Sequence, residues 1–197
     1  MRITILGRGP LAEPLAELAE RAGNTVRRVQ EAVAGSGAAD AADLLILAGS
    51  STAVEPLLAS VSPSISQVTV VVDATIPTER ERRGTEEPAG SGTGWIAVTV
   101  PRARIVRAFA SVPAEALAAL LRGSTLDTTA RLAVPLAGDD REAKAVVETF
   151  MREIGVDPFD LGALGSAEVI DPGGALWGKA LSQVEMLEAV GWLSGDG

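Results

Sequence analysis

The sequence of 197 residues contains no histidine, no cysteine and no tyrosine, and only 3% of its residues are aromatic. Without cysteine there is no disulfide framework, thiolate nucleophile or cysteine-ligated zinc, and without histidine there is no imidazole base. Serine-histidine triads, cysteine peptidases and zinc hydrolases are therefore excluded. We expect no metal site, and we assign a catalytic role to no side chain.

Basic residues and long apolar runs are also scarce. Seventeen Lys and Arg residues against 26 Asp and Glu residues give a formal net charge of -9, the wrong sign for a protein whose main partner is a phosphate backbone. No apolar stretch approaches the roughly 20 residues of a membrane span, and the apolar run near the amino terminus is too short for a signal peptide. The sequence predicts a cytoplasmic protein without nucleic-acid or membrane partners.

What the sequence does contain is a regular alternation of short β-branched runs and amphipathic stretches. Strands are predicted at 3–6, 25–29, 43–48, 67–73, 104–109 and 131–136. Helices are predicted at 11–22, 54–61, 114–121 and 141–154. This alternation is typical of an α/β fold, and we predict a Rossmann-type, doubly wound and mostly parallel sheet in one domain spanning residues 1–197.

Other segments are less regular. Residues 78–94 predict a flexible loop over the carboxyl edge of the sheet, either a lid or an ordinary surface loop. Residues 95–100 are compatible with a strand or a helix. Residues 156–160 lead to a final strand, and a last helix is expected at about 175–193. Its wide apolar face predicts core packing or a homodimer interface, with ligand stacking by Trp177 as the lesser alternative.

The turn after the first strand, Gly7-Arg8-Gly9-Pro10-Leu11-Ala12, has the G-x-G-x-x-A form of a dinucleotide-binding turn. In such a turn the first glycine permits the tight bend and the second lets the backbone approach a pyrophosphate. The positive end of the following helix faces the phosphates. The alternative is that small residues here only allow the strand and the helix to pack. Because the turn lies in a strand-helix-strand unit, we favour the nucleotide interpretation.

The end of the second strand decides which dinucleotide binds. An acidic residue there would accept a hydrogen bond from a ribose 2'-hydroxyl, whereas an arginine would accommodate a 2'-phosphate. The sequence supplies both, with Arg27 and Arg28 near the strand's end and Glu31 just beyond. We lean towards NADP, read by Arg27 and Arg28, while a solvated strand edge remains the alternative for these two arginines.

Several segments in this order resemble the F-420-dependent NADP oxidoreductase family, also described as NADPH-dependent coenzyme F-420 reductases. They are the opening turn, residues 71–77 (VVDATIP), 101–113 (PRARIVRAFASVP), 134–147 (VPLAGDDREAKAVV) and 154–164 (IGVDPFDLGAL). The resemblance extends over nearly the whole chain. The segments from 101 to 113 and from 134 to 164 are its more specific part.

The resemblance implies a Rossmann domain that holds NADP(H) and directs hydride to or from a deazaflavin, coenzyme F-420. Such chemistry depends on proximity and orientation, so a site without His, Cys or Tyr is not disabled. The residues that it places on the dinucleotide are Gly7, Arg8, Gly9, Pro10, Leu11, Gly49, Ser50, Ala74 and Thr75. Those that it places near the second cofactor are Ser111, Val112 and Pro113.

The chain also departs from the family pattern. Ala110 replaces an asparagine, residues 48–51 (AGSS) lack the usual Thr-x-Pro, and Gln30-Glu31 replaces a Ser-Arg pair. These changes remove hydrogen-bond donors from both proposed sites. Two main hypotheses follow: an NADP-dependent oxidoreductase acting on a deazaflavin or a similar small acceptor, or a non-catalytic dinucleotide-binding module with a regulatory or assembly role. A third, a methyltransferase with a similar glycine turn, is weaker because the segments beyond residue 100 do not fit it.

Overall fold

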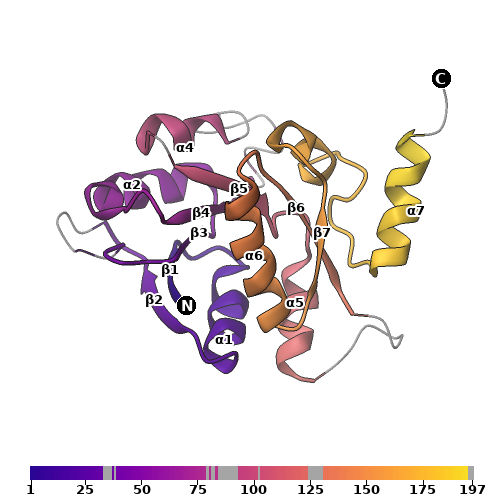
Figure 1. The fold of residues 1–197 in the computed structure, drawn as a ribbon, viewed down its shortest axis with the longest axis horizontal. Coiled ribbons are helices and arrows are strands. Elements are labelled where there is room, and N and C mark those ends of the chain that lie inside the picture. The colour runs from indigo at the N-terminus through magenta and orange to yellow at the C-terminus, as the bar shows by residue number, and fades with distance from the viewer. Residues whose placement is uncertain are drawn as a thin grey trace.

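The protein is a single α/β domain built around one seven-stranded sheet (Figure 1). The computed structural model describes residues 1–32, 37, 39–78, 80, 83, 93–101, 103–123 and 131–194. The strands are β1 (Arg2–Leu6), β2 (Thr25–Val29), β3 (Leu44–Leu47), β4 (Val70–Asp73), β5 (Arg104–Ala108), β6 (Ala133–Ala137) and β7 (Asp157–Asp160). Their order in the sheet is β2-β1-β3-β4-β5-β6-β7, and all neighbours are parallel except β5 and β6.

Helices cover both faces of this sheet, which confirms the predicted doubly wound fold. On one face lie α1 (Ala12–Arg21), α5 (Ala114–Leu121) and α6 (Arg141–Glu153), whose apolar side chains share a core with β1, β3 and β4. On the opposite face lie α2 (Ser51–Val61) and α4 (Gly94–Thr99), packed on Leu45, Leu47 and Val71 (Figure 1). Because both faces are covered, β3 and β4 are buried along their whole length, as expected for central parallel strands.

Several predicted boundaries shift by a few residues. The helix expected at 54–61 begins at Ser51, because the Ser50 hydroxyl accepts a hydrogen bond from Ala53 N and caps the helix. The segment 95–100, which the sequence left open, is the helix α4. Most of the predicted loop 78–94 lies outside the described residues.

The cap of α6 is Asp140. Asp140 accepts hydrogen bonds from the N–H groups of Glu142 and Ala143, and it also receives a two-pronged hydrogen bond from Arg104 at 2.6 and 3.0 Å. The Arg104 guanidinium, followed by the backbone donors, holds the pKa of the Asp140 carboxyl far below its usual value. Asp139 instead accepts a hydrogen bond from Leu164 N.

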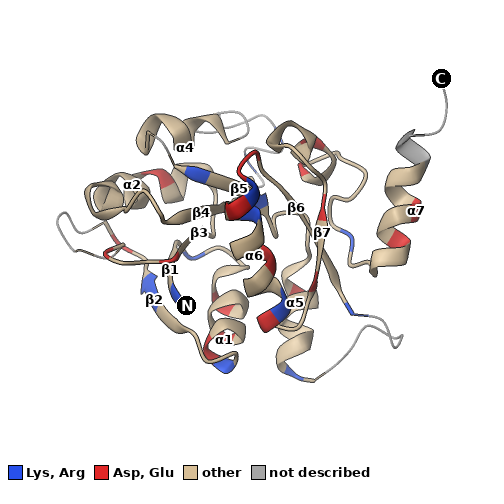
Figure 2. Cartoon of the chain, viewed as in Figure 1, with Lys and Arg blue, Asp and Glu red and all other residues tan. Residues whose placement is uncertain are grey.

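The predicted last helix, 175–193, is wrong in its first half. A 3-10 helix, η2 (Leu164–Ile170), is followed by turns, and α7 begins only at Gln183 and runs to Ser194. Gly178 has a φ of +70°, which a helix does not contain, and Ser182 and Glu185 form a capping box that starts α7. Figure 2 shows acidic residues and no basic ones on α7.

Candidate functional site

The arrangement of β1 and β3 defines the position of the site. These two strands are neighbours, yet β1 leads to α1 on one face of the sheet and β3 leads to α2 on the other. The loops that leave their carboxyl ends therefore diverge and open a crevice, which is where open α/β sheets bind ligands. The glycine turn leaves β1 at this point, and residues 48–50 leave β3 beside it.

The two loops approach each other more closely than side chains would allow. Gly9 N donates to Ala48 O at 2.8 Å, and Gly7 has a φ of +110°. A Cβ on Gly7 would lie 2.5 Å from Ala48 O, and a Cβ on Gly9 would lie 2.7 Å from Gly49 Cα. Both glycines are thus required by the contact between the loops, in addition to the approach of a pyrophosphate expected from the sequence.

A first pocket of about 330 Å³ lies over this loop contact. It is lined by Arg8, Gly9, Pro10, Gly49, Ser50, Ala53, Ile76, Pro77 and Thr78. Five of the residues predicted to hold the dinucleotide are therefore brought together here, at the amino end of α1. The positive end of the α1 dipole lies at this pocket and favours an anion. Gly9 N and Ala12 N already donate to Ala48 O and Gly9 O, and Pro10 and Pro14 have no N–H group.

A second pocket of about 320 Å³ adjoins the first, since Pro10 and Ile76 line both. Its lining residues are Pro10, Leu11, Ile76, Ala110, Ser111, Val112, Pro113, Ala114, Glu115, Trp177 and Gly178. The three residues predicted near a second cofactor lie together here. Leu11, predicted on the phosphates, lines this pocket rather than the first. Trp177, the lesser alternative in the sequence, forms part of its wall.

Ala74 and Thr75, predicted beside the nicotinamide, are buried and line neither of these two pockets. Thr75 belongs instead to a buried polar network. Its N–H and hydroxyl both donate to Asp73 Oδ1, at 3.0 and 2.7 Å. Asp73 thus caps the turn that follows β4.

The centre of that network is Arg107 on β5, which sequence reasoning missed. Its guanidinium pairs with Asp73 Oδ1 at 3.0 Å and with Asp171 Oδ1 at 2.7 Å, and it donates to Thr75 O at 2.9 Å. The Arg107 and Asp73 side chains are only 7% and 1% exposed. Because Asp171 follows η2, the network ties the ends of β4 and β5 to the segment that supplies Trp177.

Two buried polar atoms at this end of the sheet have no hydrogen-bond partner among the described residues, Asp73 Oδ2 and Ser111 Oγ. Ser111 lines the second pocket, and its carbonyl accepts a hydrogen bond from Gly178 N at 2.8 Å. Two residues before Ser111, Phe109 adopts a φ of +66°. Its ring packs edge-on against that of Phe150 on α6, with 6.1 Å between the ring centroids. Buried polar groups normally have partners, so the Ser111 hydroxyl is a candidate ligand contact.

The arginines predicted to read a 2'-phosphate line neither pocket. Arg28 donates to both carboxylate oxygens of Glu20 on α1, at 2.6 and 3.2 Å, and this contact lowers the pKa of Glu20. Arg27 donates to Gly37 O at 3.2 Å. Arg8, inside the glycine turn, pairs with Glu31 at 3.4 Å.

Among the residues that the structure describes, no helix is both long enough and apolar enough to cross a membrane. The same residues contain no group of three or more carboxylates placed to hold a metal ion.

The chain shares its fold with solved structures. A hypothetical protein from Sinorhizobium meliloti superposes with a TM-score of 0.72 at 23% identity, covering 93% of this chain and 96% of that one. A protein provisionally described as an F420-dependent NADP-reductase, from Arthrobacter sp. FB24, superposes with a TM-score of 0.68 at 20% identity. The match covers 85% of this chain and 87% of that one. These similarities support, at the level of the fold, the family resemblance stated from the sequence.

A curated relative is similar in sequence over a shorter stretch. The rat protein Metalloreductase STEAP3 is 32% identical over 102 residues, which is 52% of this chain and 19% of the metalloreductase. The chain thus spans about a fifth of the length of that relative. No protein-family model matches the chain.

Proposed function

We propose that this protein is an oxidoreductase that binds a nicotinamide dinucleotide in the first pocket and exchanges hydride with a small acceptor in the second. The observation that carries the proposal is the contact between the two pockets at the switch point of the sheet, with Pro10 and Ile76 as shared walls. A dinucleotide that crosses this boundary would bring its reactive end against the second ligand. Such positioning accounts for a large part of the rate of a reaction between two bound molecules.

The residues present fit such a cofactor. The glycine turn lies where a Cβ would collide with the neighbouring loop, and the positive end of the α1 dipole lies beside it. When bound, a nicotinamide dinucleotide supplies or accepts the hydride. The chain's own contribution is to bind and orient. Gly9 and Ser50 would flank the phosphates, the Ser111 hydroxyl would be available to the acceptor, and Ile76 would exclude water from the boundary while Trp177 covers the second pocket.

The family resemblance implies NADP(H) and coenzyme F-420 as the pair of cofactors. The apolar walls and the aromatic face of Trp177 suit a flat heterocycle such as a deazaflavin. The homodimer predicted through the last helix stays a prediction. Val184 and Leu187 on α7 are 65% and 60% exposed, which is compatible with a partner on that helix.

Thermal unfolding with and without dinucleotides tests the proposal, because a ligand that binds only the folded state raises Tm. We expect a concentration-dependent rise with at least one of NADH and NADPH. Loss of nicotinamide absorbance is then followed with a deazaflavin or flavin acceptor. If neither dinucleotide raises Tm at millimolar concentration, the proposal fails.

The second candidate is a dinucleotide-binding module without catalysis. Ala110 favours this candidate. It lines the second pocket with a methyl group, which cannot form a hydrogen bond to a bound hydride acceptor. This candidate predicts a stable complex with a reduced dinucleotide that never loses its hydride to a deazaflavin or flavin. Turnover with either acceptor would exclude it.

A further inference from the structure

The end of β2 lies directly beside the glycine turn. Val29, the last residue of β2, is paired with Leu6, the last residue of β1, and Gly7 N donates to Val29 O at 2.9 Å. The chain that leaves β2 at Gln30 and Glu31 therefore passes alongside the turn. Glu31 follows the turn by roughly 20 residues, the spacing at which a dinucleotide-binding fold places its contact to the adenosine ribose.

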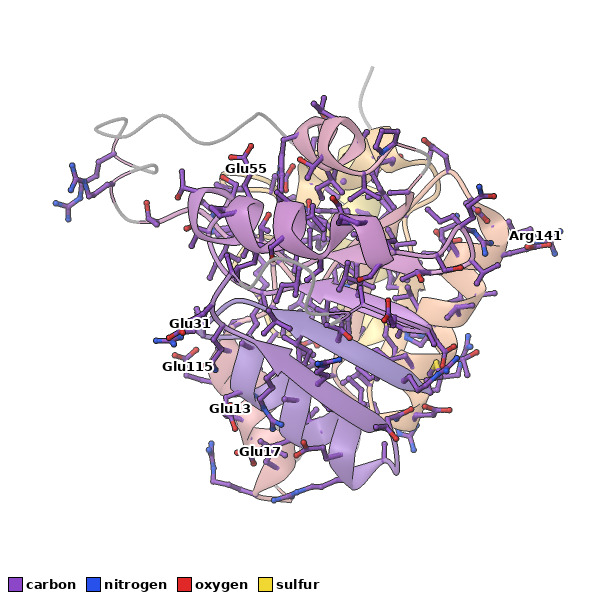
Figure 3. The ribbon with its side chains drawn as sticks, turned by 90° about the vertical axis from the view of Figure 1, so that its left-hand side faces the viewer. Glu13, Glu17, Glu31, Glu55, Glu115 and Arg141 are labelled. Carbon is purple, nitrogen blue, oxygen red and sulfur yellow. The ribbon has the colours of Figure 1, made fainter. Side chains whose placement is uncertain are left out.

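Glu31, like Arg27 and Arg28, lines neither pocket, but its carboxylate lies beside Arg8, which lines the first. One of its oxygens lies 3.4 Å from Arg8 Nη2, and the side chain is otherwise 82% exposed. Figure 3 shows Glu31 projecting from the surface of the molecule on the same side as Glu13 and Glu17 of α1. An ionised carboxylate only accepts hydrogen bonds, so it can receive a ribose hydroxyl but repels a phosphate.

The cations that could compensate for this charge are engaged elsewhere. Arg28 is held on α1 by Glu20 and lies 3.6 Å from Glu13 as well. Arg27 points to the opposite face of β2, since neighbouring residues in a strand alternate, and donates to Gly37 O. The sequence from 33 to 38, VAGSGA, contains no charged residue.

Arg8 is thus the cation that the described residues place beside the turn, and it is paired with Glu31. We infer that Glu31 makes the dinucleotide pocket selective for a 2'-hydroxyl over a 2'-phosphate on the adenosine ribose, so that the cofactor is NAD(H) rather than NADP(H). This inference rests on the proposed function. It departs from the expectation of NADP(H) that followed from the sequence of β2 and from the family resemblance.

Titration of the full-length protein with NADH and NADPH tests the selectivity. We expect NADH to bind roughly tenfold more tightly, since the repulsion between two exposed charges at contact amounts to about one factor of ten in Kd. The preference should shrink as salt is added, because exposed charges are screened. The variant E31Q should reduce the preference, and E31R should reverse it.

A matched control makes the same change of charge away from the pocket. Glu188 is exposed on α7, and E188R should leave the ratio of the two Kd values unchanged. Because Arg8 neutralises part of the Glu31 charge, R8A should strengthen the preference for NADH, and an R8A variant that prefers NADPH would overturn the inference.

Other outcomes also overturn it. If the unaltered protein binds NADPH more tightly than NADH, the selectivity is refuted while the proposed function stays intact. The same holds if E31R has the same ratio of the two Kd values as the unaltered protein. If the unaltered protein binds neither dinucleotide, the proposed function fails and the inference fails with it.

Discussion

The two adjoining pockets are built in opposite ways. The first depends on missing side-chain atoms, because Gly7 and Gly9 let the loops after β1 and β3 touch through their backbones. The second is lined by residues far apart in the sequence, and Arg107, paired with Asp73 and Asp171, joins the segments that supply Ile76 and Trp177. A pocket made by backbone contact is specified locally, whereas one made by an ion network is specified by the whole fold.

The network has a cost that the glycine contact lacks. Removing charges from water is unfavourable by several kcal/mol per ion unless each charge finds well-placed partners. Arg107 finds them in two carboxylates and in the carbonyl of Thr75. Its benefit is therefore a defined position for the strand ends and the segment after η2 rather than a large net gain in stability.

The largest effect is expected from Arg107→Ala. The change leaves the Asp73 carboxylate buried and uncompensated, and the free energy of unfolding should fall by about 3–5 kcal/mol in urea denaturation. The matched control is Arg104→Ala on the same strand, whose partner Asp140 is 37% exposed. We expect that control to lose about 1 kcal/mol. Equal losses in the two variants would contradict the contrast between buried and exposed pairs.

Gly9→Val tests the first pocket. Its Cβ would collide with Gly49 Cα and Ala48 O, so the loops must separate, at a cost in stability of about 1–3 kcal/mol. Binding of both dinucleotides should be lost in titration. The control is Gly191→Ala on α7, where a Cβ would meet nothing within 4 Å. It should leave binding intact and stabilise α7 by up to about 1 kcal/mol.

The variant Asp140→Asn tests the pair of Asp140 and Arg104 through the pH dependence of stability. Asparagine can still cap α6, so the variant should lose only the ionic part of the contact with Arg104, about 1 kcal/mol or less. Because the pKa of Asp140 is lowered, this contribution is complete above the ordinary value of 3.8 and is lost as the pH falls towards the lowered pKa. In urea denaturation between pH 7 and pH 3, the difference in the free energy of unfolding between the unaltered protein and the variant should become smaller as the pH falls. A difference that grows in acid would contradict the assignment.

Ser111→Ala should have the smallest effect on stability. Its hydroxyl has no hydrogen-bond partner among the described residues, so its removal should change the free energy of unfolding by less than about 0.5 kcal/mol. The KM for the acceptor should rise several-fold while the Kd of the dinucleotide stays the same. An equal loss for both ligands would mean that the pockets are not separate.

The same contrast explains how far the sequence predicted the molecule. The strands depend on short-range patterns, and the structure confirms them with boundaries shifted by a few residues. The glycine turn follows the first strand as expected, and its role in dinucleotide binding stays a prediction. The Arg107 network depends on the register of β4 against β5, which pairs Asp73 with Arg107. A charged residue in the middle of an apolar strand was the signal available in the sequence, but its partners could not be named without the sheet order.

Side-chain direction limited the prediction of the site. The role of Arg27 and Arg28 at the ribose stays a prediction. Their contacts with Gly37 and Glu20 depend on the faces of β2 and on the position of α1, which the sequence does not give. The last helix was extended too far because its apolar residues continue back through Leu176. The capping box at Ser182 and Glu185 was the local signal that would have corrected its start.

The left-handed conformation of Phe109 has a consequence for how this protein can evolve. A bulky residue with positive φ carries a backbone cost of about 1–2 kcal/mol, which its burial and its contact with Phe150 offset. Glycine would relieve the backbone but leave a cavity, and a β-branched residue would increase the strain. The position is therefore nearly closed to mutation, and changes in the wall of the second pocket are expected at residues 111–113 instead.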